Sequence, residues 1–488
     1  MSPMAMRVVS SSAMQLAFVA LLLAGCATVD PYESPPMSRN LQREDDVGYC
    51  ARLFADIDRR VDLLAVRDAE AHRVAGFPYL RVDRFSAALS PLAATAEQQR
   101  AWHSRLQQLD QTARATELAN AALNIDDLPR CRELLGAADS AAVNELRAAA
   151  KVPDDYSIGM RVFGLYPLTR LPFAAGIARW HSDTRAVFAT PLDAVPVRGR
   201  LQRYAPASAP SKTALPTLMV DALGVPVSSA EEQVALLSRH APILEIDVVG
   251  TFDRIGALKL DADDRVSVDS AVPVAYTRIS YTLLGGVVHR QLVYTFWFSE
   301  RPPASGSTFD LLAGKLDGVV WRVTVDSAGD ALVYDSIHAC GCYHLFFPTE
   351  KVAARELPDT LDESLFVPQT LPAVRASDRV VLRLESGAHY LQRVLTYTDQ
   401  NSAANTVYEL KDERTLTALA RPSGGTRSAY DGGGLIPGGE RGERWFFWPM
   451  GIESAGQMRQ WGRHATAFVG RRHFDDPRLF DAYFELRR

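Results

Sequence analysis

The pattern of apolar positions changes once along the chain, from a helical spacing to an alternating one. From about residue 45, apolar side chains recur at steps of three and four, as at Cys50, Phe54, Ile57 and Val61. This spacing places one apolar stripe along a helix, which can then pack against a core. We therefore predict a mainly helical domain over residues 45–198.

Local signals mark where several of these helices begin. Thr95 with Gln98, and Ser229 with Glu232, each match a capping box, in which two side chains bind the free N–H groups of a first turn. Pro129 suits the first turn of another short helix, because a proline lacks the N–H that this turn leaves unpaired. The Ser229 helix is expected to precede the first strands.

An alternating pattern begins near residue 244 and continues through long β-branched and aromatic runs. Two such runs, 274–284 and 287–298, are joined by Gly285-Gly286, a pair that favours a tight hairpin. Asp317-Gly318 and residues 326–330 give further turn signals. Consecutive strands without crossover helices indicate an antiparallel β domain over residues 217–360, so the predicted fold class is α+β.

Two segments lack a clear period. Residues 199–216 are rich in Ala, Pro and Ser, and we interpret them as a linker or surface loop between the two domains. Residues 361–488 combine a strand-like run with a glycine-rich segment and an aromatic, arginine-rich end, and are treated as a mixed C-terminal region.

The N-terminus carries a targeting signal. Residues 1–25 contain one base, no acid and an apolar stretch too short to span a bilayer. The stretch ends in Leu23-Ala24-Gly25-Cys26, which resembles the lipobox of bacterial lipoproteins. The resemblance implies cleavage before Cys26 and acylation of that residue, with palmitate among the chains. Residues 26–44, which include several prolines, then form an extended tether.

The lipobox also bears on location and partners. Ala27 rather than Asp follows the lipidated cysteine, which in bacterial lipoproteins favours the outer membrane over the inner one. The expected partner is thus a lipid bilayer, reached through acylated Cys26, with the body in the periplasm. The 488 residues include 53 Lys or Arg and 58 Asp or Glu, a formal charge of -5, which argues against a nucleic-acid partner.

The sequence lacks several common catalytic and nucleotide-binding motifs, which limits the classes of function to consider. The sequence has no HExxH, no GxSxG, no Walker lysine motif, no GxGxxG after a strand and no paired CxxC. We therefore favour a non-catalytic envelope lipoprotein, a binding or structural module whose further partner is an envelope protein or glycan. The alternative is an envelope enzyme, or a metal or redox protein.

That alternative centres on four side chains at steps of two, namely His338, Cys340, Cys342 and His344. Thiolate and imidazole ligands suit zinc or copper. Four residues at steps of two along a strand cannot converge on one ion unless the chain bends, and Gly341 is the residue that could permit a bend. A metal site would then need completion by a distant residue such as His464 or His473. A strained disulfide between the two thiols, or simple local packing, are the other interpretations.

The C-terminus offers a basic cluster. Arg459, Arg463 and His464 precede His473 and Asp475, with further arginines between them. Arginine matches oxyanions, so an anion site is one interpretation, and His473 with Asp475 as an acid–base pair is another. The third is that these residues only cap and solvate a terminal element.

Two cysteines remain. Cys50 and Cys131 fall in two predicted helices of one domain, outside the cytoplasm, where thiols are normally oxidised. We predict a disulfide between them.

Overall fold

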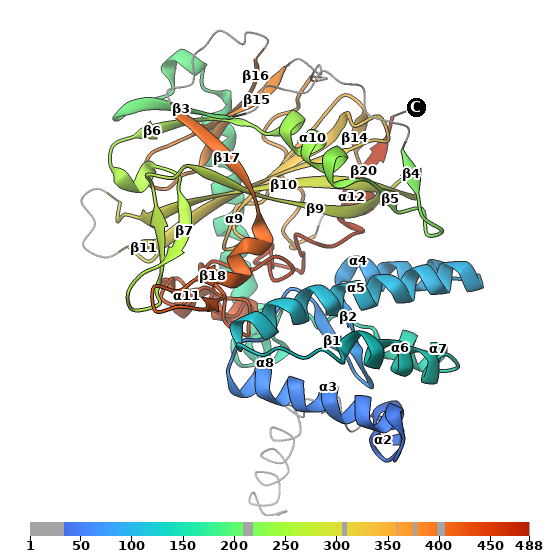
Figure 1. Ribbon diagram of the computed structural model, residues 1–488. Coiled ribbons are helices and arrows are strands. Elements are labelled where there is room, and N and C mark those ends of the chain that lie inside the picture. Colours follow the sequence, from blue (N-terminus) through green and yellow to red (C-terminus); the bar gives the residue numbers. More distant parts are fainter. Residues whose placement is uncertain are drawn as a thin grey trace, which may run out of the picture.

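The computed structural model describes residues 34–207, 218–304, 310–358, 360–372, 374, 378–397 and 406–487. A helical region over residues 35–194 is followed by a large, curled and mostly antiparallel sheet (Figure 1). The predicted α+β class is therefore confirmed. The expected signal peptide and Cys26 lie outside the described residues.

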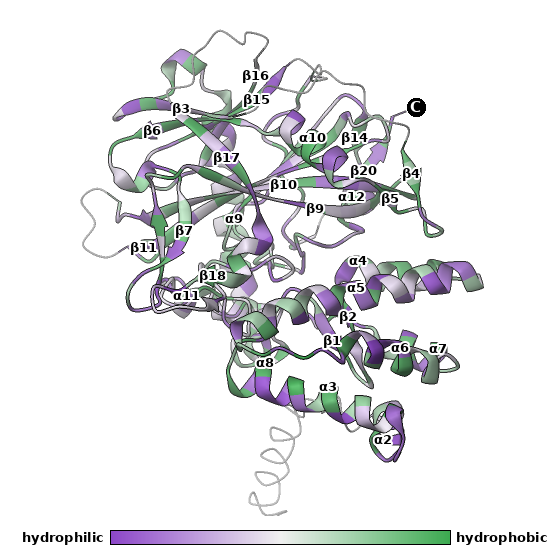
Figure 2. Ribbon diagram, in the orientation of Figure 1, coloured by the Kyte–Doolittle hydropathy of each residue, from purple (hydrophilic) through white to green (hydrophobic). Residues whose placement is uncertain are grey.

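The helices within residues 35–149 pack around one core, and the amphipathic helix α3 (Asp46–Leu63) shows alternating hydrophobic and hydrophilic bands (Figure 2). The capping box of Thr95 is present at the start of α5, and Pro129 lies in the first turn of α6, as predicted. The helices are α2 (Pro35–Leu41), α3 (Asp46–Leu63), α4 (Arg84–Leu89), α5 (Ala96–Asn120), α6 (Leu128–Ala138), α7 (Val143–Ala149), α8 (Ile158–Phe163) and α9 (Tyr166–Ala189), with short 3-10 turns η2 (Ser90–Leu92) and η3 (Leu192–Ala194).

Two features of this region differ from the sequence prediction. The expected tether ends early, because residues 35–41 form helix α2 and bury Met37 completely in the core. A hairpin of β1 (His72–Val74) and β2 (Phe77–Val82) also lies inside the helical region and packs against α5. Every residue of β2 is buried, so its two faces both contact helices and its sequence shows no alternation.

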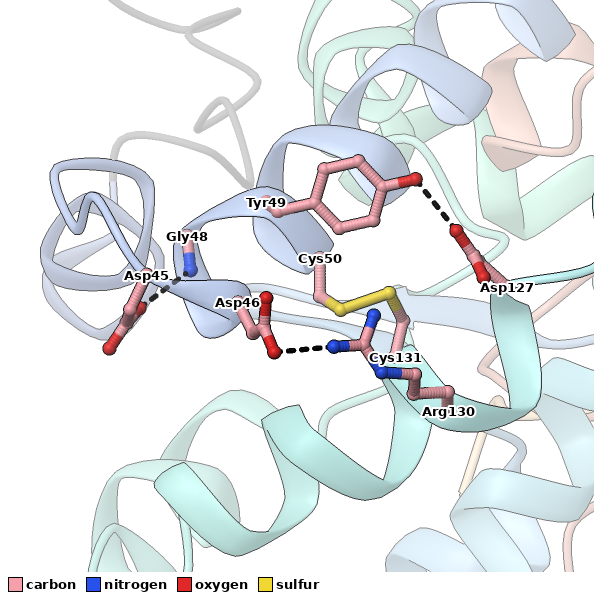
Figure 3. Close-up of a disulfide and its surroundings, with 8 residues drawn as sticks. All are labelled: Asp45, Asp46, Gly48, Tyr49, Cys50, Asp127, Arg130 and Cys131. Atoms are coloured by element: carbon pink, nitrogen blue, oxygen red, sulfur yellow. Dashed lines mark hydrogen bonds and ion pairs between the residues drawn. A yellow bond between two sulfur atoms is a disulfide. The ribbon is translucent and has the colours of Figure 1, made fainter.

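Helices α3 and α6 are joined by the predicted disulfide between Cys50 and Cys131, whose Cα atoms lie 5.0 Å apart (Figure 3). Both cysteines are fully buried. The Tyr49 hydroxyl also donates to Asp127 over 2.8 Å, and Arg130 pairs with Asp46, so polar contacts flank the covalent link.

The main sheet has ten strands in the order β13-β12-β11-β10-β9-β17-β3-β6-β15-β16. Three neighbouring pairs are parallel, β9 with β17, β17 with β3 and β6 with β15, and the others are antiparallel. The strands are β3 (Arg200–Pro206), β6 (Ile243–Val248), β9 (Val274–Leu284), β10 (Val287–Arg301), β11 (Gly314–Val325), β12 (Ala331–His338), β13 (Leu345–Pro348), β15 (Arg379–Leu384), β16 (Leu391–Tyr397) and β17 (Thr406–Asp412).

Smaller elements surround this sheet. Four two-stranded pairs are β4 (Met219–Val220) with β5 (Pro226–Val227), β7 (Ala257–Leu260) with β8 (Val266–Asp269), β14 (Val352–Ala354) with β20 (Phe484–Leu486), and β18 (Leu419–Ala420) with β19 (Thr426–Arg427). The helices are α10 (Ala230–His240), with the predicted capping box of Ser229, α11 (Arg444–Phe447), α12 (Leu479–Tyr483), η4 (Thr251–Asp253), η5 (Glu413–Ala418) and η6 (Trp448–Met450).

The domain boundaries drawn from the sequence need correction. Residues 200–206 of the expected linker form β3, an interior strand bonded to both β17 and β6. Its backbone hydrogen bonds hold it in the sheet while only Tyr204 is buried, which explains the missing apolar period. Strands β15 to β17 likewise belong to the same sheet, so the mixed C-terminal region is not a separate unit. Residues 208–217 lie outside the described part of the chain.

Two of the three turns predicted from the sequence are present and the third is not. Gly285 and Gly286 form the predicted hairpin turn between β9 and β10, with φ values of 64° and 78°, and residues 326–330 connect β11 to β12. The prediction of a turn at Asp317-Gly318 is wrong, because both residues lie within β11. Packing requires glycine at position 318, because a Cβ atom at this position would lie 2.8 Å from the Cβ atom of Ala339.

The sheet curls around an aromatic core that includes Phe296, Trp321 and Phe347. The curl brings its two edge strands together, because Leu345 of β13 and Leu391 of β16 line one cavity. Helix α9 covers this seam between the edges. No helix among the described residues is long and apolar enough to cross a membrane.

Candidate functional site

Helix α9 roofs a cavity with two compartments, one on each side of Trp180 and Tyr343. These two rings lie 5.2 Å apart, and both line each compartment. The larger compartment measures about 430 Å³ and the smaller about 180 Å³. Residues 172–180 of α9 cover the larger compartment, and residues 180–187 cover the smaller one.

The smaller compartment lies in the seam of the curled sheet. Its floor comes from β11 and β12 and from the two edge strands, β13 and β16. The two edge strands lie far apart in the sequence. Its other lining residues are Asp183, Thr184, Val187, Val319, Ser336, His338, Leu345, Glu385, His389, Tyr390, Leu391 and Gln392. An apolar wall with a cluster of polar groups at its base is the usual composition of a small-molecule site.

Beneath this floor, buried acidic and basic side chains form a chain of contacts. His389 donates from Nδ1 to Oδ2 of Asp317 over 2.8 Å, and its Nε2 lies 3.5 Å from Oδ1 of Asp253. On the other side, Nδ1 of His338 lies 3.6 Å from Oδ1 of Asp317. Asp317 and His389 are fully buried, so one carboxylate faces two imidazoles out of contact with water.

The charges in this chain balance. Arg441 donates to Oδ1 of Asp317 over 3.1 Å. Burial alone raises the pKa of Asp317, but Arg441 and the two histidines outweigh it and hold that pKa well below its usual value. Burial alone lowers the pKa of His389, but hydrogen bonds to Asp253 and Asp317 outweigh it and raise that pKa. The raised pKa favours the cationic form of His389, which lies between two carboxylates.

His338 has the opposite character. Burial lowers its pKa, and Asp317 opposes this only in part, so the neutral imidazole is favoured. Because Nδ1 faces Asp317, the carboxylate orients a ring that also lines the smaller compartment. A neutral imidazole oriented by a carboxylate can accept a proton or a hydrogen bond from a molecule in the cavity.

The larger compartment is mainly apolar. Its wall combines one face of α9 with aromatic residues of the C-terminal segment, and its lining residues are Pro172, Phe173, Gly176, Ile177, Leu312, Cys342, Glu363, Glu443, Phe447, Thr466 and Phe468. Glu363 is bound to Arg472 over 2.8 Å. Burial raises the pKa of Glu443 to about 7, against the opposing effect of Arg441 and Arg301. Glu443 thus gives this apolar space a carboxyl that is neutral below neutral pH.

The four residues at steps of two lie on a tight loop. The His338 N–H donates to the Cys342 carbonyl over 2.9 Å, and Gly341 has a φ of 94°, so the predicted bend at Gly341 is confirmed. Cys340 and Cys342 are free, buried thiols, which excludes the disulfide interpretation for this structure. A hydrogen bond from Cys342 lowers the pKa of Cys340, while the same contact raises the pKa of Cys342.

The two histidines of this segment do not join the thiols. His338 faces Asp317, whereas Nε2 of His344 lies 2.8 Å from Oδ2 of Asp335, which also binds Arg322. Burial lowers the pKa of His344 to about 3. Within the described ranges, no group of three His, Cys, Asp or Glu side chains is arranged to hold a metal ion.

The basic C-terminal cluster packs against the cysteine loop. Arg459 donates from Nε to the Cys340 carbonyl over 3.2 Å, and Nε2 of His464 lies 3.1 Å from the Ala339 carbonyl oxygen. The sequence could not show that these two segments meet. Their contacts are made with backbone oxygens, so His464 supports the loop rather than completing a metal site.

The remaining residues of that cluster pair with acids of the protein itself. Arg463 lies 3.1 Å from Asp155, and His473 lies 3.3 Å from Asp154. Asp475 pairs with Arg84 over 3.3 Å, not with His473 as the acid–base interpretation requires. These arginines are neutralised by the chain's own carboxylates, so the geometry gives no support to an external anion site.

Sequence reasoning identified His338 and Cys342 but missed Asp317, His389 and Glu443. Asp317 did leave a signal, because an acid inside an apolar run followed by Gly also fits a buried charge within a strand. His389 lies in the β15–β16 turn with a φ of 54°, and nothing local marks it or Glu443 as functional.

Comparison with known proteins identified no relative of this chain: no family model matches it, and no curated protein or solved structure does so.

Proposed function

We propose that the protein is a lipoprotein of the bacterial cell envelope, anchored at the outer membrane through acylated Cys26, and that its folded part binds an amphipathic molecule beneath α9. The observation that carries the binding role is the larger compartment, about 430 Å³ with a mainly apolar wall and the carboxyl of Glu443, whose pKa is raised to about 7. A cavity of this size and composition suits the body of a small organic molecule.

The polar groups restrict the class of ligand. An apolar body, such as an acyl chain, matches Phe173, Ile177 and Phe468, whereas a free charge would be desolvated against them. Glu443, neutral below about pH 7, can donate a hydrogen bond to an ester or carboxylic acid oxygen. The ligand expected is therefore an amphipathic molecule with a long apolar part and a single polar group.

Photo-crosslinking in membranes tests this role with the full chain. The probe is a palmitic acid analogue with a diazirine at the end of its acyl chain, and modified peptides are mapped by mass spectrometry. We expect crosslinks on peptides that contain Cys342 or Phe468, which face the interior of the compartment, and we expect excess unlabelled palmitic acid to compete for them.

Two variants of α9 provide the matched comparison. Gly176 lines the compartment and a Cβ atom added there meets nothing within 4 Å, so we expect the ring of Gly176→Phe to occupy the compartment and reduce these crosslinks at least about tenfold. Ala178 is exposed on the same helix and does not line the cavity, so Ala178→Phe should leave them unchanged. Interior crosslinks that do not compete, or that persist in Gly176→Phe, would contradict the proposal.

A redox role for Cys340 and Cys342 is the second candidate, favoured by their direct hydrogen bond and by the position of Cys342 in the cavity wall. The two thiols would form one disulfide while the disulfide of an envelope thiol oxidoreductase is reduced to two thiols. Trapping cells with acid and alkylating the unfolded chain would show a mixture of reduced and oxidised Cys340–Cys342. A fully reduced pair under all growth conditions would exclude this role.

A further inference from the structure

Helix α8 and the first half of α9 expose large apolar side chains to solvent. The exposed fractions are 66% for Ile158, 63% for Val162, 66% for Phe163, 61% for Leu165, 65% for Leu168 and 50% for Leu171. Trp445 and Phe446 of α11 are exposed by 69% and 57%. We call these eight residues the α8–α11 face. Large apolar side chains gathered in this way mark an interaction surface rather than ordinary exposure.

The three helices of this face are in contact. Helix α8 packs against η6, which directly follows α11 in the chain, and a Cβ atom at Gly164 would lie 2.5 Å from the side chain of Pro449. The rings of Phe173 and Phe447 lie 5.2 Å apart and connect α9 to α11. The apolar side chains therefore belong to one surface.

The segment of this surface that joins α8 to the first half of α9 carries basic residues only. Residues 158–179 contain Arg161, Arg170 and Arg179 and no acidic residue. Arg444 lies over the Trp445 ring, 4.8 Å from its centroid. Arginine beside exposed Trp, Phe and Leu is typical of helices that lie in the headgroup region of a bilayer, where the cations face lipid phosphates.

From this combination we propose that the α8–α11 face docks on an anionic phospholipid bilayer, with its apolar side chains at the boundary of the acyl chains. This inference rests on the proposed function, because it makes the anchoring membrane the source of the ligand. Figure 1 shows α8 at the same end of the molecule as α2 and α3, away from β15 and β16. Cys26 lies eight residues before Ser34, the first described residue. Because eight residues span at most about 28 Å, an acylated Cys26 would keep Ser34 within that distance of the lipid anchor.

Docking would place the larger compartment at the membrane surface. Pro172 and Phe447 line that compartment, and each directly follows a residue of the face, Leu171 or Phe446. An acyl chain can then pass from the bilayer to the cavity along apolar side chains without crossing water. The ligand class that follows is a membrane lipid or a free fatty acid taken from the bilayer.

Fluorescence quenching tests the docking with the full chain reconstituted in vesicles of phosphatidylcholine and phosphatidylglycerol brominated on their acyl chains. The chain has seven Trp residues, so wild type and Trp445→Phe are compared to isolate Trp445. We expect wild type to lose a larger fraction of its fluorescence than Trp445→Phe. The difference should shrink at least twofold in vesicles of phosphatidylcholine alone.

Substitution of exposed apolar residues by Asp provides a disruptive variant of the face and a matched control elsewhere on the surface. The double variant Leu168→Asp, Leu171→Asp should abolish the Trp445-dependent quenching, measured as its difference from the same variant with Trp445→Phe. Met219→Asp with Val234→Asp, at two exposed apolar residues on β4 and α10, should leave that quenching unchanged. Should the double variant fail to fold, the comparison of wild type with Trp445→Phe decides by itself.

Equal quenching of wild type and Trp445→Phe would overturn the inference. A double variant that turns a dimer into a monomer in sedimentation, with quenching unaffected, would overturn it in favour of a second copy of the chain on this face. If palmitic acid competes for the crosslinks at Cys342 or Phe468 but Trp445 is not quenched, membrane docking is rejected and the ligand site is retained. Quenching without those crosslinks would support docking and reject the ligand site.

Discussion

The imidazole of His389 donates a hydrogen bond to the carboxylate of Asp317 over 2.8 Å, although the two residues are 72 positions apart. Asp317 lies on β11, His389 lies in the turn between β15 and β16, and five strands separate β11 from β15 in the sheet. The contact exists only because the sheet curls until its edges meet. It thus ties the closure of the fold to the floor of the cavity.

Removing the charge of Asp317 should destabilise the protein strongly. Asp317→Asn removes the carboxylate that His389 and Arg441 share and leaves His389 with Asp253 alone, and breaking a buried pair in this way costs about 3–5 kcal/mol. Denaturant unfolding measures the loss. Asp193→Asn, at an exposed position, serves as the control and should change the free energy of unfolding by less than about 0.5 kcal/mol. A similarly small effect at Asp317 would show that the charge chain is not structural.

Glu443 should make stability fall as the pH rises. Burial raises its pKa from 4.5 to about 7, so the folded protein favours the neutral carboxyl. The contribution is fully present below pH 4.5 and is lost as the pH rises through about 7, amounting to about 3 kcal/mol across that window. Unfolding titrations at several pH values should show this slope in wild type and in the exposed control Glu409→Gln, and a smaller slope in Glu443→Gln. Equal slopes in all three proteins would refute the raised pKa.

The disulfide between Cys50 and Cys131 should stabilise the helical region. Because the two residues are 81 positions apart, the link restricts the unfolded chain considerably, and Cys50→Ala with Cys131→Ala should lose about 4 kcal/mol. Wild type in reducing buffer should approach the stability of the double variant. A mass measurement that finds both residues as free thiols in protein from the envelope would contradict the pairing.

Cys26 is predicted to be the point of membrane attachment. Cys26→Ser removes the thiol that carries acyl chains, and such chains contribute about 0.8 kcal/mol per buried methylene group. Fractionation after a high-salt wash should find the wild type in the membrane pellet and the variant largely released from it. Docking through the α8–α11 face alone is reversible, so a variant that sediments as completely as wild type would contradict the lipoprotein assignment.

Several elements follow from neighbouring residues alone, which is why they could be predicted. The capping boxes of Thr95 and Ser229 and the hairpin at Gly285-Gly286 depend on contacts within a few residues. The pairing of Cys50 with Cys131 needed only that two helices share one core in an oxidising compartment. In each case the interactions that decide the structure are either local or covalent.

Other elements were mistaken because their environment comes from distant residues. Residues 200–206 carry no apolar period and yet form an interior strand, since β6 and β17 supply their hydrogen bonds. Asp317-Gly318 resembles a turn, but Gly318 is needed for the close approach of Ala339, and Asp317 is stabilised within a strand by Arg441 and His389. A dipeptide does not reveal whether a charge has a partner elsewhere.

The sequence by itself therefore determined the α+β class, several helix starts, one hairpin and one disulfide, together with the candidate residues His338 and Cys342. Only the tertiary structure decided what those candidates face. The curl of the sheet places Asp317 against His338 and His389, and α9 closes the seam above them. Burial then shifts the pKa of each group according to its new neighbours, and those neighbours are brought together by strand pairing and helix packing over long sequence distances.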